Sequence, residues 1–488
     1  MNKKILFIPL DERPCNRLFP NQIIEYTNGF TLFEPPLNIL GNKKMPSDFK
    51  LLKAFILNNV SAADALIISI DQLLYGGIVP SRVHHLSTSE LYSRLSLINE
   101  IKKTKPNIII YAFALIMRCP TYSSSDEEPD YYETYGKEIN QIGSLIHKNM
   151  DYSHLLIDEL KEYLSDYMDR RKTNLLMVKE TISLLSKGVI DYLIIPQDDS
   201  QVSGFTAMDK EVIFKETSKF NSNQIGIYPG ADEVGLTLIS RIINKLNCSS
   251  KRIYIDPLYS ESLSLIPSYE NMPLYSTIEN QIKASLNIIT NSYDDADIVL
   301  FINYNKDRQD EAYTQGDITN KDIVLSQLER IKKAKKDGKT VGLVDKYYVN
   351  GGNLKYMDML YKTIGFSYID SYASWNTSSN SLGTVISFAT ILSYSNNPQN
   401  RNKFFAQRIY DDLIYQGYVR NYISSNILDN LGLTIFDLKG KEEYITKIAK
   451  EKIEEYAKTH FPILYSDYKI ERIELPWRRM FEVDIEVE

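Results

Sequence analysis

Carboxylate side chains that could transfer protons occur in adjacent pairs directly after short apolar runs. Asp198 and Asp199 follow the run Tyr192–Pro196, and Asp232 and Glu233 follow the next run along the chain. Repulsion between adjacent carboxylates raises the pKa of one of them, which can then hold a proton for general-acid work. We therefore predict that these four residues are catalytic, with Asp198 or Asp199 as the general acid and Asp232 or Glu233 as the second carboxylate. The competing interpretation is that Asp232 or Glu233 only caps the helix that follows.

Two carboxyl groups about 5 to 10 Å apart are what glycoside hydrolysis requires, and a close pair also suits substrate-assisted cleavage of N-acetyl sugars. Neighbouring strands of a sheet lie about 5 Å apart, so carboxylates that follow neighbouring strands can reach this spacing. The pattern favours a glycoside hydrolase or a related carbohydrate-active hydrolase with a small-molecule substrate.

A second set of polar and aromatic residues occupies the same kind of position and is predicted to bind the substrate. An aromatic face beside amide side chains, as at Trp375 and Asn376, suits a sugar ring. The predicted binding residues are Asp11, Glu12, Arg13, Asn16, Asp71, Arg118, Asp345, Asn350, Trp375, Asn376 and Asn380. The arginines could instead form internal salt bridges, and Trp375 could be a packing residue of the core.

Two other chemistries stay open. Aspartates after several runs, including Asp11, Asp71 and Asp345, could form an all-oxygen Mg²⁺ or Ca²⁺ site in a metal-dependent hydrolase or transferase. Their spacing neither requires nor excludes this, and we assign no metal ligand. The chain has no Walker loop, no Gly-x-Gly-x-x-Gly and no Gly-x-Ser-x-Gly, so we predict no cofactor. The third alternative is a non-catalytic protein that closes on a small ligand.

The elements that would position these residues are short apolar runs separated by segments long enough for a helix, which is typical of a parallel α/β fold. Ligands in such folds bind beyond the carboxyl ends of the strands. The predicted strands are Lys4–Leu10, Thr31–Phe33, Ala65–Ile70, Ile108–Ile116, Tyr192–Pro196, Ile225–Tyr228, Arg252–Ile255, Ile298–Ile302, Thr340–Val344 and Phe366–Ile369.

The polar stretch Asn247–Ser250 divides these runs into six before it and four after it. We predict an N-terminal parallel α/β domain, barrel-like or doubly wound, over residues 1–250. A smaller Rossmann-like α/β domain is expected over 251–396, and a mostly helical segment over 397–488.

Composition indicates a globular protein. Of 488 residues, 43% are hydrophobic and 24% are charged, and 56 Lys and Arg against 63 Asp and Glu give a net charge of −7. This balance disfavours nucleic acid as a partner. No apolar run is long enough to span a membrane, the first run is too short for a signal peptide, and three scattered cysteines predict no disulfide framework. We expect no membrane partner and a cytoplasmic location.

Several motifs in order resemble a bacterial family known only as a domain of unknown function, DUF4127. They are Pro-Leu-Asp-Glu-Arg-Pro-Cys-Asn at 9–16, Gln-Asp-Asp-Ser at 197–200, Gly-Ala-Asp-Glu at 230–233, Asn-Gly-Gly at 350–352, Trp-Asn-Thr at 375–377 with Asn380, and Leu-Pro-Trp-Arg-Arg-Met-Phe-Glu at 475–482. The resemblance spans nearly the whole chain. It implies a complete bacterial cytoplasmic protein and carries no established activity.

Overall fold

The computed structural model describes residues 2–198, 200–395 and 401–488, which divide into two compact units. The first unit comprises Met1–Asn21, Gly29–Leu238 and Tyr269–Asn271, and the second comprises Gln22–Asn28, Ile239–Ser268 and Met272–Glu488. Each is described by itself below. The expected domain boundaries at residues 250 and 396 stay predictions.

The first unit is built on an open sheet of six parallel strands in the order β2-β1-β3-β4-β5-β6. The edge strands β2 and β6 do not pair with each other, so the sheet is open and does not close into a barrel. Of the two forms that the sequence left open, this is the doubly wound one. The strands are β1 Lys3–Ile8, β2 Phe30–Phe33, β3 Ala65–Ser69, β4 Ile109–Phe113, β5 Tyr192–Gln197 and β6 Ile225–Pro229.

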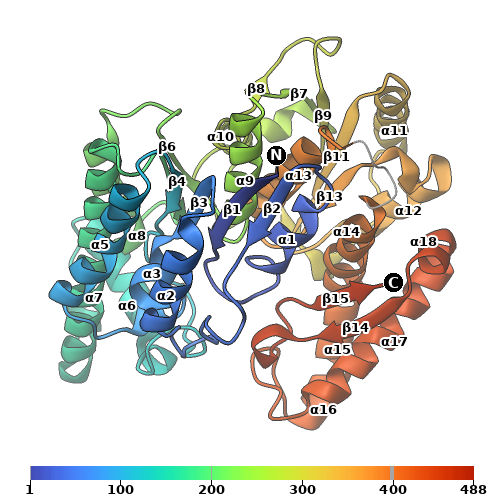
Figure 1. Ribbon diagram of the computed structural model, residues 1–488. Helices are drawn as coiled ribbons and strands as arrows, with labels where there is room; N and C mark the ends of the chain where they lie inside the picture. The colour runs from blue at the N-terminus through green and yellow to red at the C-terminus, as the bar shows by residue number, and fades with distance from the viewer. Residues whose placement is uncertain (1, 199, 396–400) are drawn as a thin grey trace. The chain divides into compact units, whose positions relative to one another are not determined.

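Helices cover both faces of this sheet because successive side chains of a strand point to opposite sides. Leu6 and Ile8 of β1 pack in one core with α2 Phe49–Val60, α3 Ile70–Tyr75, α5 Thr88–Thr104 and α7 Asp158–Ser186 (Figure 1). Phe7 points to the other face, where α9 Val234–Leu246 approaches so closely that a Cβ on Gly235 would lie 2.8 Å from the Phe7 ring. The remaining helices containing residues of this unit are α1 Leu18–Ile24, α4 Pro80–Val83, α6 Tyr132–His147 and α8 Phe205–Thr217.

The second unit contains a five-stranded parallel sheet in the order β13-β11-β9-β7-β8. Its strands are β7 Arg252–Pro257, β8 Ile288–Ile289, β9 Ile298–Tyr304, β11 Thr340–Lys346 and β13 Ser371–Ala373. Read from its other edge, this order is β8-β7-β9-β11-β13. If the five strands are numbered 1 to 5 along the chain, the order is 2-1-3-4-5, which is also the order of the first five strands of the other sheet. Strand order therefore reverses between β1 and β3 in one unit and between β7 and β9 in the other. Such switch points are where doubly wound folds bind ligands.

This second sheet is also covered on both faces. Ile298, Leu300 and Ile302 of β9 pack against α10 Leu274–Ala284 and α13 Ser378–Leu392. Val299 and Phe301 face the opposite side, where they share one core with α11 Lys321–Lys336, α12 Leu354–Thr363 and residues from 405 onward.

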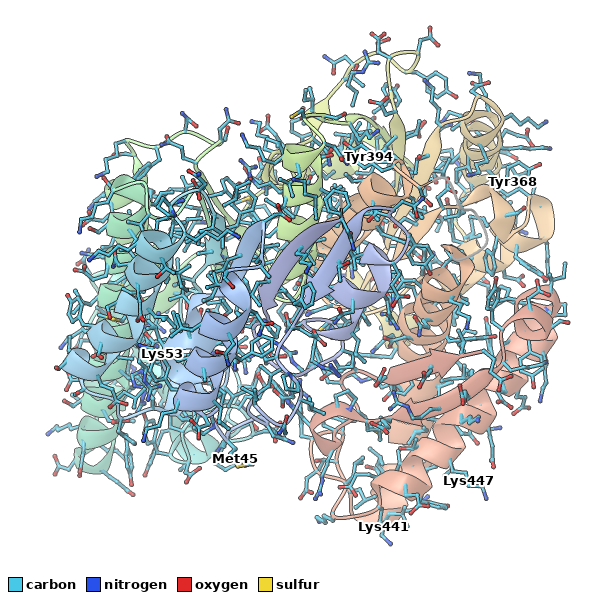
Figure 2. All side chains as sticks on the ribbon, in the orientation of Figure 1. Met45, Lys53, Tyr368, Tyr394, Lys441 and Lys447 are labelled. Atoms are coloured by element: carbon cyan, nitrogen blue, oxygen red, sulfur yellow. The ribbon has the colours of Figure 1, made fainter. Side chains whose placement is uncertain are left out.

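The chain from 401 onward is mostly helical, as predicted, and includes two π-helical stretches, Ile409–Val419 and Ser424–Leu428. Helix α17 Glu442–His460 is amphipathic: Ile445, Ala449 and Ile453 are buried, while Lys441, just before the helix, and Lys447 are exposed (Figure 2). The other helices are α14 Arg401–Arg408, α15 Arg420–Ile423, α16 Asp429–Leu431 and α18 Pro462–Asp467. An antiparallel pair, β14 Ile470–Glu474 and β15 Asp484–Val487, joins them.

Nine of the ten predicted strands are present, and the tenth is wrong. Phe366–Tyr368 forms a 3-10 turn, and β13 begins only at Ser371. The apolar side chain that suggested a strand belongs to an aromatic cluster instead, because the Phe366 ring packs 5.0 Å from Phe461. The strands that the sequence missed include β8 and the pair β10 Asp310–Glu311 and β12 Tyr348–Val349, each two residues long and too short for a periodic signal.

Candidate functional site

The carboxyl ends of β1, β3, β4, β5 and β6 bring the first unit's predicted residues to one edge of its sheet, as the parallel arrangement requires. Of these, Asp71, Arg118 and Asp198 line the same small cavity. The cavity encloses about 230 Å³ of empty space, open solvent included. Most of this space is open to solvent, because the enclosed part has room for only about one water molecule, so the cavity can take one small group of a ligand.

Asp71 is the buried carboxyl group of this cavity. It lies in the first turn of α3, which begins where β3 ends, and the Leu115 backbone N–H after β4 donates to its Oδ2 at 2.9 Å. Burial raises the pKa of Asp71 from 3.8 to about 7, although the Leu115 hydrogen bond opposes the rise. A carboxyl group with such a pKa exchanges its proton near neutral pH, which general acids and bases must do.

An arginine–carboxylate cluster forms the charged wall of the cavity and its surroundings; it consists of Arg82, Arg118, Glu127, Glu128 and Asp198. Arg82 donates to Asp198 at 2.7 Å and to Glu127 at 2.8 Å. Arg118 donates to Glu128 at 2.7 Å and to Glu127 at 3.0 Å, and its Nη1 lies 3.9 Å from Asp198. Two guanidinium groups thus face three acidic side chains, and Arg82 forms an ion pair with Asp198.

Glycines place Arg82 in this cluster. The C-cap of α3 is Gly76, whose φ of +90° favours glycine, and a Cβ there would lie 2.6 Å from the Ser47 backbone nitrogen. The chain then turns back through Gly77 into α4, which carries Arg82. The Tyr75-Gly-Gly segment therefore has a structural role that brings a guanidinium group to the cavity.

A half-buried histidine orients another cavity residue. The Leu86 N–H donates to Nδ1 of His84 at 3.2 Å, so Nε2 carries the proton and donates to Asn174 Oδ1 at 2.8 Å. Burial lowers the pKa of His84 to about 4, which keeps the ring neutral. Asn174, fixed in this way, donates to the Ser81 carbonyl at 2.8 Å and lines the cavity.

Asp11, Arg13, Asn16 and Asp232 form a second buried cluster in the first unit. Arg13 donates to Asp11 at 2.8 Å and to Asp232 at 2.6 Å, and Asn16 donates to both carboxylates. The arrangement is that of an internal ion-pair network. It ties the segment after β1 to the segment after β6.

The other predicted residues of the first unit have distinct places. Glu12 accepts from the Lys43 backbone N–H at 2.8 Å and so holds a loop. Glu233 is buried, and its carboxylate lies against Gly230, where a Cβ would come within 2.5 Å of Oε1. Asp199 lies outside the described residues. The catalytic and binding roles assigned from sequence stay predictions.

In the second unit, Asp345 at the end of β11 is fully buried and accepts three hydrogen bonds. Asn303 Nδ2 donates to its Oδ1 at 2.7 Å, and the Asn353 N–H and Tyr372 Oη donate to its Oδ2 at 2.7 and 3.2 Å. Burial raises the pKa of Asp345 to about 6, although these hydrogen bonds oppose the rise. Asp345 is therefore placed to orient Asn303.

Trp375 lies in a loop that a buried aspartate holds. The Asp412 Oδ2 accepts the backbone N–H groups of Ser374 at 2.8 Å and Trp375 at 3.0 Å, and Arg408 donates to its Oδ1 at 2.6 Å. The Trp375 ring packs edge-on against Phe481 at 5.7 Å and is 7% exposed, a packing position.

The three predicted asparagines of the second unit also serve its loops. The Asn350 N–H donates to the Asn376 carbonyl at 3.1 Å, and both residues have positive φ, which asparagine tolerates. The Asn380 N–H donates to the Thr377 hydroxyl, the N-cap of α13.

Several residues that line or support these sites were not among the site residues predicted from the sequence. Glu127 and Glu128 lie in a polar insert after β4, and Asn303 follows an apolar run, so the rule of inspecting strand ends would have found them. Asp412 is on a π-helical segment far along the chain, and no local pattern marked it.

Within the described residues, no group of three or more His, Cys, Asp or Glu side chains is arranged to hold a metal ion. None of the helices described is both long and apolar enough to cross a bilayer. All three cysteines are free thiols.

Comparison with protein-family models identifies the family of the chain. The model of the family described as "Protein of unknown function (DUF4127)" matches residues 5–486, which confirms the resemblance seen in the motifs. No curated protein matches the chain.

Proposed function

Since the chain belongs to the DUF4127 family, whose description names no activity, we propose a function from the chemistry of its first unit: hydrolysis of a carbohydrate substrate by paired carboxyl groups. Asp71 is the proton-transferring group and Asp198 is the second carboxylate. The observation that carries the proposal is that both line one small cavity, one raised in pKa to about 7 by burial and the other ion-paired with Arg82.

The pairing matches the division of labour in glycoside hydrolysis. One carboxyl group must be protonated to donate to the leaving oxygen, while the other must be ionised to act as base or nucleophile. Environments that push two carboxyl groups apart in pKa supply this difference. This proposal moves the general-acid role from Asp198 or Asp199 to Asp71, because Asp198 accepts a charge-assisted bond from Arg82.

Arg82, Arg118 and Asn174 supply the binding groups of the proposed site. Guanidinium and amide N–H groups donate to sugar hydroxyl oxygens, and Asp198 can accept from a sugar hydroxyl. The small-molecule partner, a cytoplasmic location, a bacterial source and the absence of nucleic-acid and membrane partners belong to the same proposal. The three free thiols and the net charge of −7 support it.

The test is a screen of the purified chain against chromogenic and fluorogenic glycosides, including N-acetylhexosaminides, with and without EDTA. On a responsive substrate, we expect Asp71→Asn and Asp198→Asn to lower kcat at least about 100-fold, the usual scale for removing an acid or base. Asp64→Asn is the matched control. Asp64 binds the Lys4 N–H at 2.8 Å before β3, at the opposite edge of the same sheet, so this change should leave turnover unchanged.

The pH profile separates a proton-transfer role from a structural one. If Asp71 acts as the acid, kcat falls as pH rises above about 7, and the Asn variant lacks that limb. Turnover of Asp71→Asn within threefold of the unsubstituted protein would contradict the assignment. Release that EDTA abolishes would favour the metal-dependent alternative, and binding without product would favour the ligand-binding one.

A further inference from the structure

The loops that follow β12 and β13 in the second unit meet at one residue of the π-helical segment, Asp412. Its side-chain Oδ2 accepts the Ser374 and Trp375 N–H groups at 2.8 and 3.0 Å. Its backbone carbonyl accepts the Gly352 N–H at 3.0 Å and the Ser374 hydroxyl at 2.9 Å. One residue therefore holds two loops at the carboxyl edge of the second sheet, the edge at which doubly wound folds bind ligands.

Glycines allow the π-helical segment Ile409–Val419 to lie directly against one of these loops. A Cβ on Gly351 would come within 2.9 Å of the Gln416 Cβ, and a Cβ on Gly417 would lie 3.2 Å from the Gly352 carbonyl oxygen. Such close packing transmits a small displacement of the segment to the loop. Short π-helical stretches are frequent at functional sites, which agrees with a role in moving the loops.

Asp411, the chain neighbour of Asp412, shares its cation. Arg408 Nη1 donates to Asp412 Oδ1 at 2.6 Å and to Asp411 Oδ2 at 3.0 Å, and all three side chains are at most 3% exposed. Burial raises the pKa of Asp411 to about 7, while Arg408 opposes the rise and the charge of Asp412 adds to it. One guanidinium group therefore serves one carboxylate while Asp411 is protonated, and two once it ionises.

Other titratable or charged groups surround this pair. They are Asp345 on β11, Tyr372 on β13, Tyr415 on the π-helical segment, Arg420 on α15, Arg479 and Glu482 before β15, and Asp484 on β15. Burial raises the pKa of both tyrosines, so neither ionises near neutral pH. Burial also raises the pKa of Asp345, to about 6, and that of Asp484. The effect of Asp411 must therefore be separated from the effects of these two carboxyl groups.

We propose that Asp411 is a proton-operated latch on these loops. While Asp411 is neutral, Arg408 serves Asp412 alone, and Asp412 holds the Ser374 and Trp375 N–H groups. When Asp411 releases its proton to solvent, it repels Asp412 and takes a share of Arg408, so the loop that carries Trp375 loosens. The carboxyl edge of the second sheet is thus held below neutral pH and loosened above it. The latch lies entirely within the second unit and is independent of the proposed hydrolysis.

The first test follows the Trp375 ring by fluorescence in full-length Trp477→Phe, in which Trp375 is the only tryptophan. The pH is varied from about 5 to about 9. We expect the emission to shift to longer wavelength and its quenching by acrylamide to rise at least about twofold as the loop loosens, with a midpoint near pH 7.

Hydrogen exchange measures the same event in the unsubstituted protein. Mass spectrometry of the peptide that contains the Ser374 and Trp375 N–H groups gives their exchange rate. After correction for the intrinsic effect of pH, we expect exchange at least about fivefold faster at about pH 8 than at about pH 6. A peptide from β9, in the middle of the same sheet, should show no such change, which separates loop release from general unfolding.

Variants assign the transition to one carboxyl group. Asp411→Asn cannot ionise and still offers Arg408 an acceptor, so it should abolish the transition and keep the loop held at about pH 8. Asp345→Asn and Asp484→Asn are the matched controls, because they remove the two other carboxyl groups nearby whose pKa burial raises. Each should leave the midpoint near pH 7.

Three results would overturn the latch. They are emission and corrected exchange that do not depend on pH, a transition that survives Asp411→Asn, and a transition that Asp345→Asn or Asp484→Asn abolishes. If Asp411→Asn does not fold, exchange in the unsubstituted protein decides, because equal corrected rates at the two pH values exclude release of the loop.

Discussion

At the scale of single residues, Asp71 shows how burial alone creates a group that titrates near neutral pH. Backbone hydrogen bonds, the Leu115 N–H first among them, and the charge of Arg82 lower its pKa, but together they do not offset the loss of solvation. Asp198 differs because Arg82 donates to it directly. Two residues of the same type therefore acquire opposite chemical roles through their neighbours, which is the physical basis of the proposed acid and carboxylate.

The raised pKa of Asp71 predicts a pH-dependent stability. Between pH 4 and 7 the folded protein keeps a proton that the unfolded chain has released, so its free energy of unfolding falls as pH rises through this window. The shift of about three pKa units corresponds to at most about 4 kcal/mol. Asp71→Asn cannot ionise, so we expect its Tm to exceed that of the unsubstituted protein at pH 8 but not at pH 5.

Differential scanning calorimetry at the two pH values measures this difference. Asp64→Asn again serves as the control, because its side chain is half-buried and bonded to a backbone N–H at the far edge of the sheet. A Tm difference between Asp71→Asn and the unsubstituted protein that is the same at pH 5 and pH 8 would refute the raised pKa.

At the scale of elements, the loop after β13 depends on a residue from a different helix. The buried Asp412 carboxylate accepts hydrogen bonds from two backbone N–H groups of the loop and forms an ion pair with the buried Arg408. We predict that Asp412→Ala lowers the free energy of unfolding by about 2–4 kcal/mol, because the Ser374 and Trp375 N–H groups lose their buried acceptor, while Arg408 keeps its ion pair with Asp411. Urea denaturation measures this loss.

Tryptophan fluorescence can independently detect release of the loop that carries Trp375. In a Trp477→Phe background Trp375 is the only tryptophan, and Asp412→Ala should shift its emission to longer wavelength as the ring gains water. Asp429→Ala, which removes an exposed aspartate of α16, should change neither stability nor emission. An unshifted spectrum for Asp412→Ala would mean that Phe481 packing, and not Asp412, fixes the ring.

The sequence predicted elements well where they are long and periodic, and it predicted site positions through the single rule that strand ends carry chemistry. That rule collected Asp71, Arg118 and Asp198 at one cavity. It could not show that Arg13 would bridge Asp11 to a carboxylate 219 residues away, nor that burial would outweigh the charge of Arg82 at Asp71. Those outcomes depend on pairing across the fold, which local patterns do not encode.

At the scale of the whole molecule, the two sheets share one strand order but complete their cores differently. In the first unit, helices between the strands cover the face that carries Leu6 and Ile8. In the second, the face that carries Val299 and Phe301 is covered partly by α11 and α12 and partly by helices from 401 onward. The mostly helical C-terminal segment thus shares a hydrophobic core with the second sheet.

This shared core predicts the result of a truncation. A chain stopped after Ser395 would expose the part of the shared core that Ile409, Leu413 and Ile414 complete, at about 1.5–3 kcal/mol for each large apolar side chain. Since a domain is stable by only about 5–15 kcal/mol, we expect the second unit of this truncated chain not to fold. Limited proteolysis should then cut rapidly between residues 252 and 395, whereas the full-length protein should resist under the same conditions. Resistance of that region in the truncated chain would mean that residues 251–396 form an independent domain, as the sequence pattern suggested.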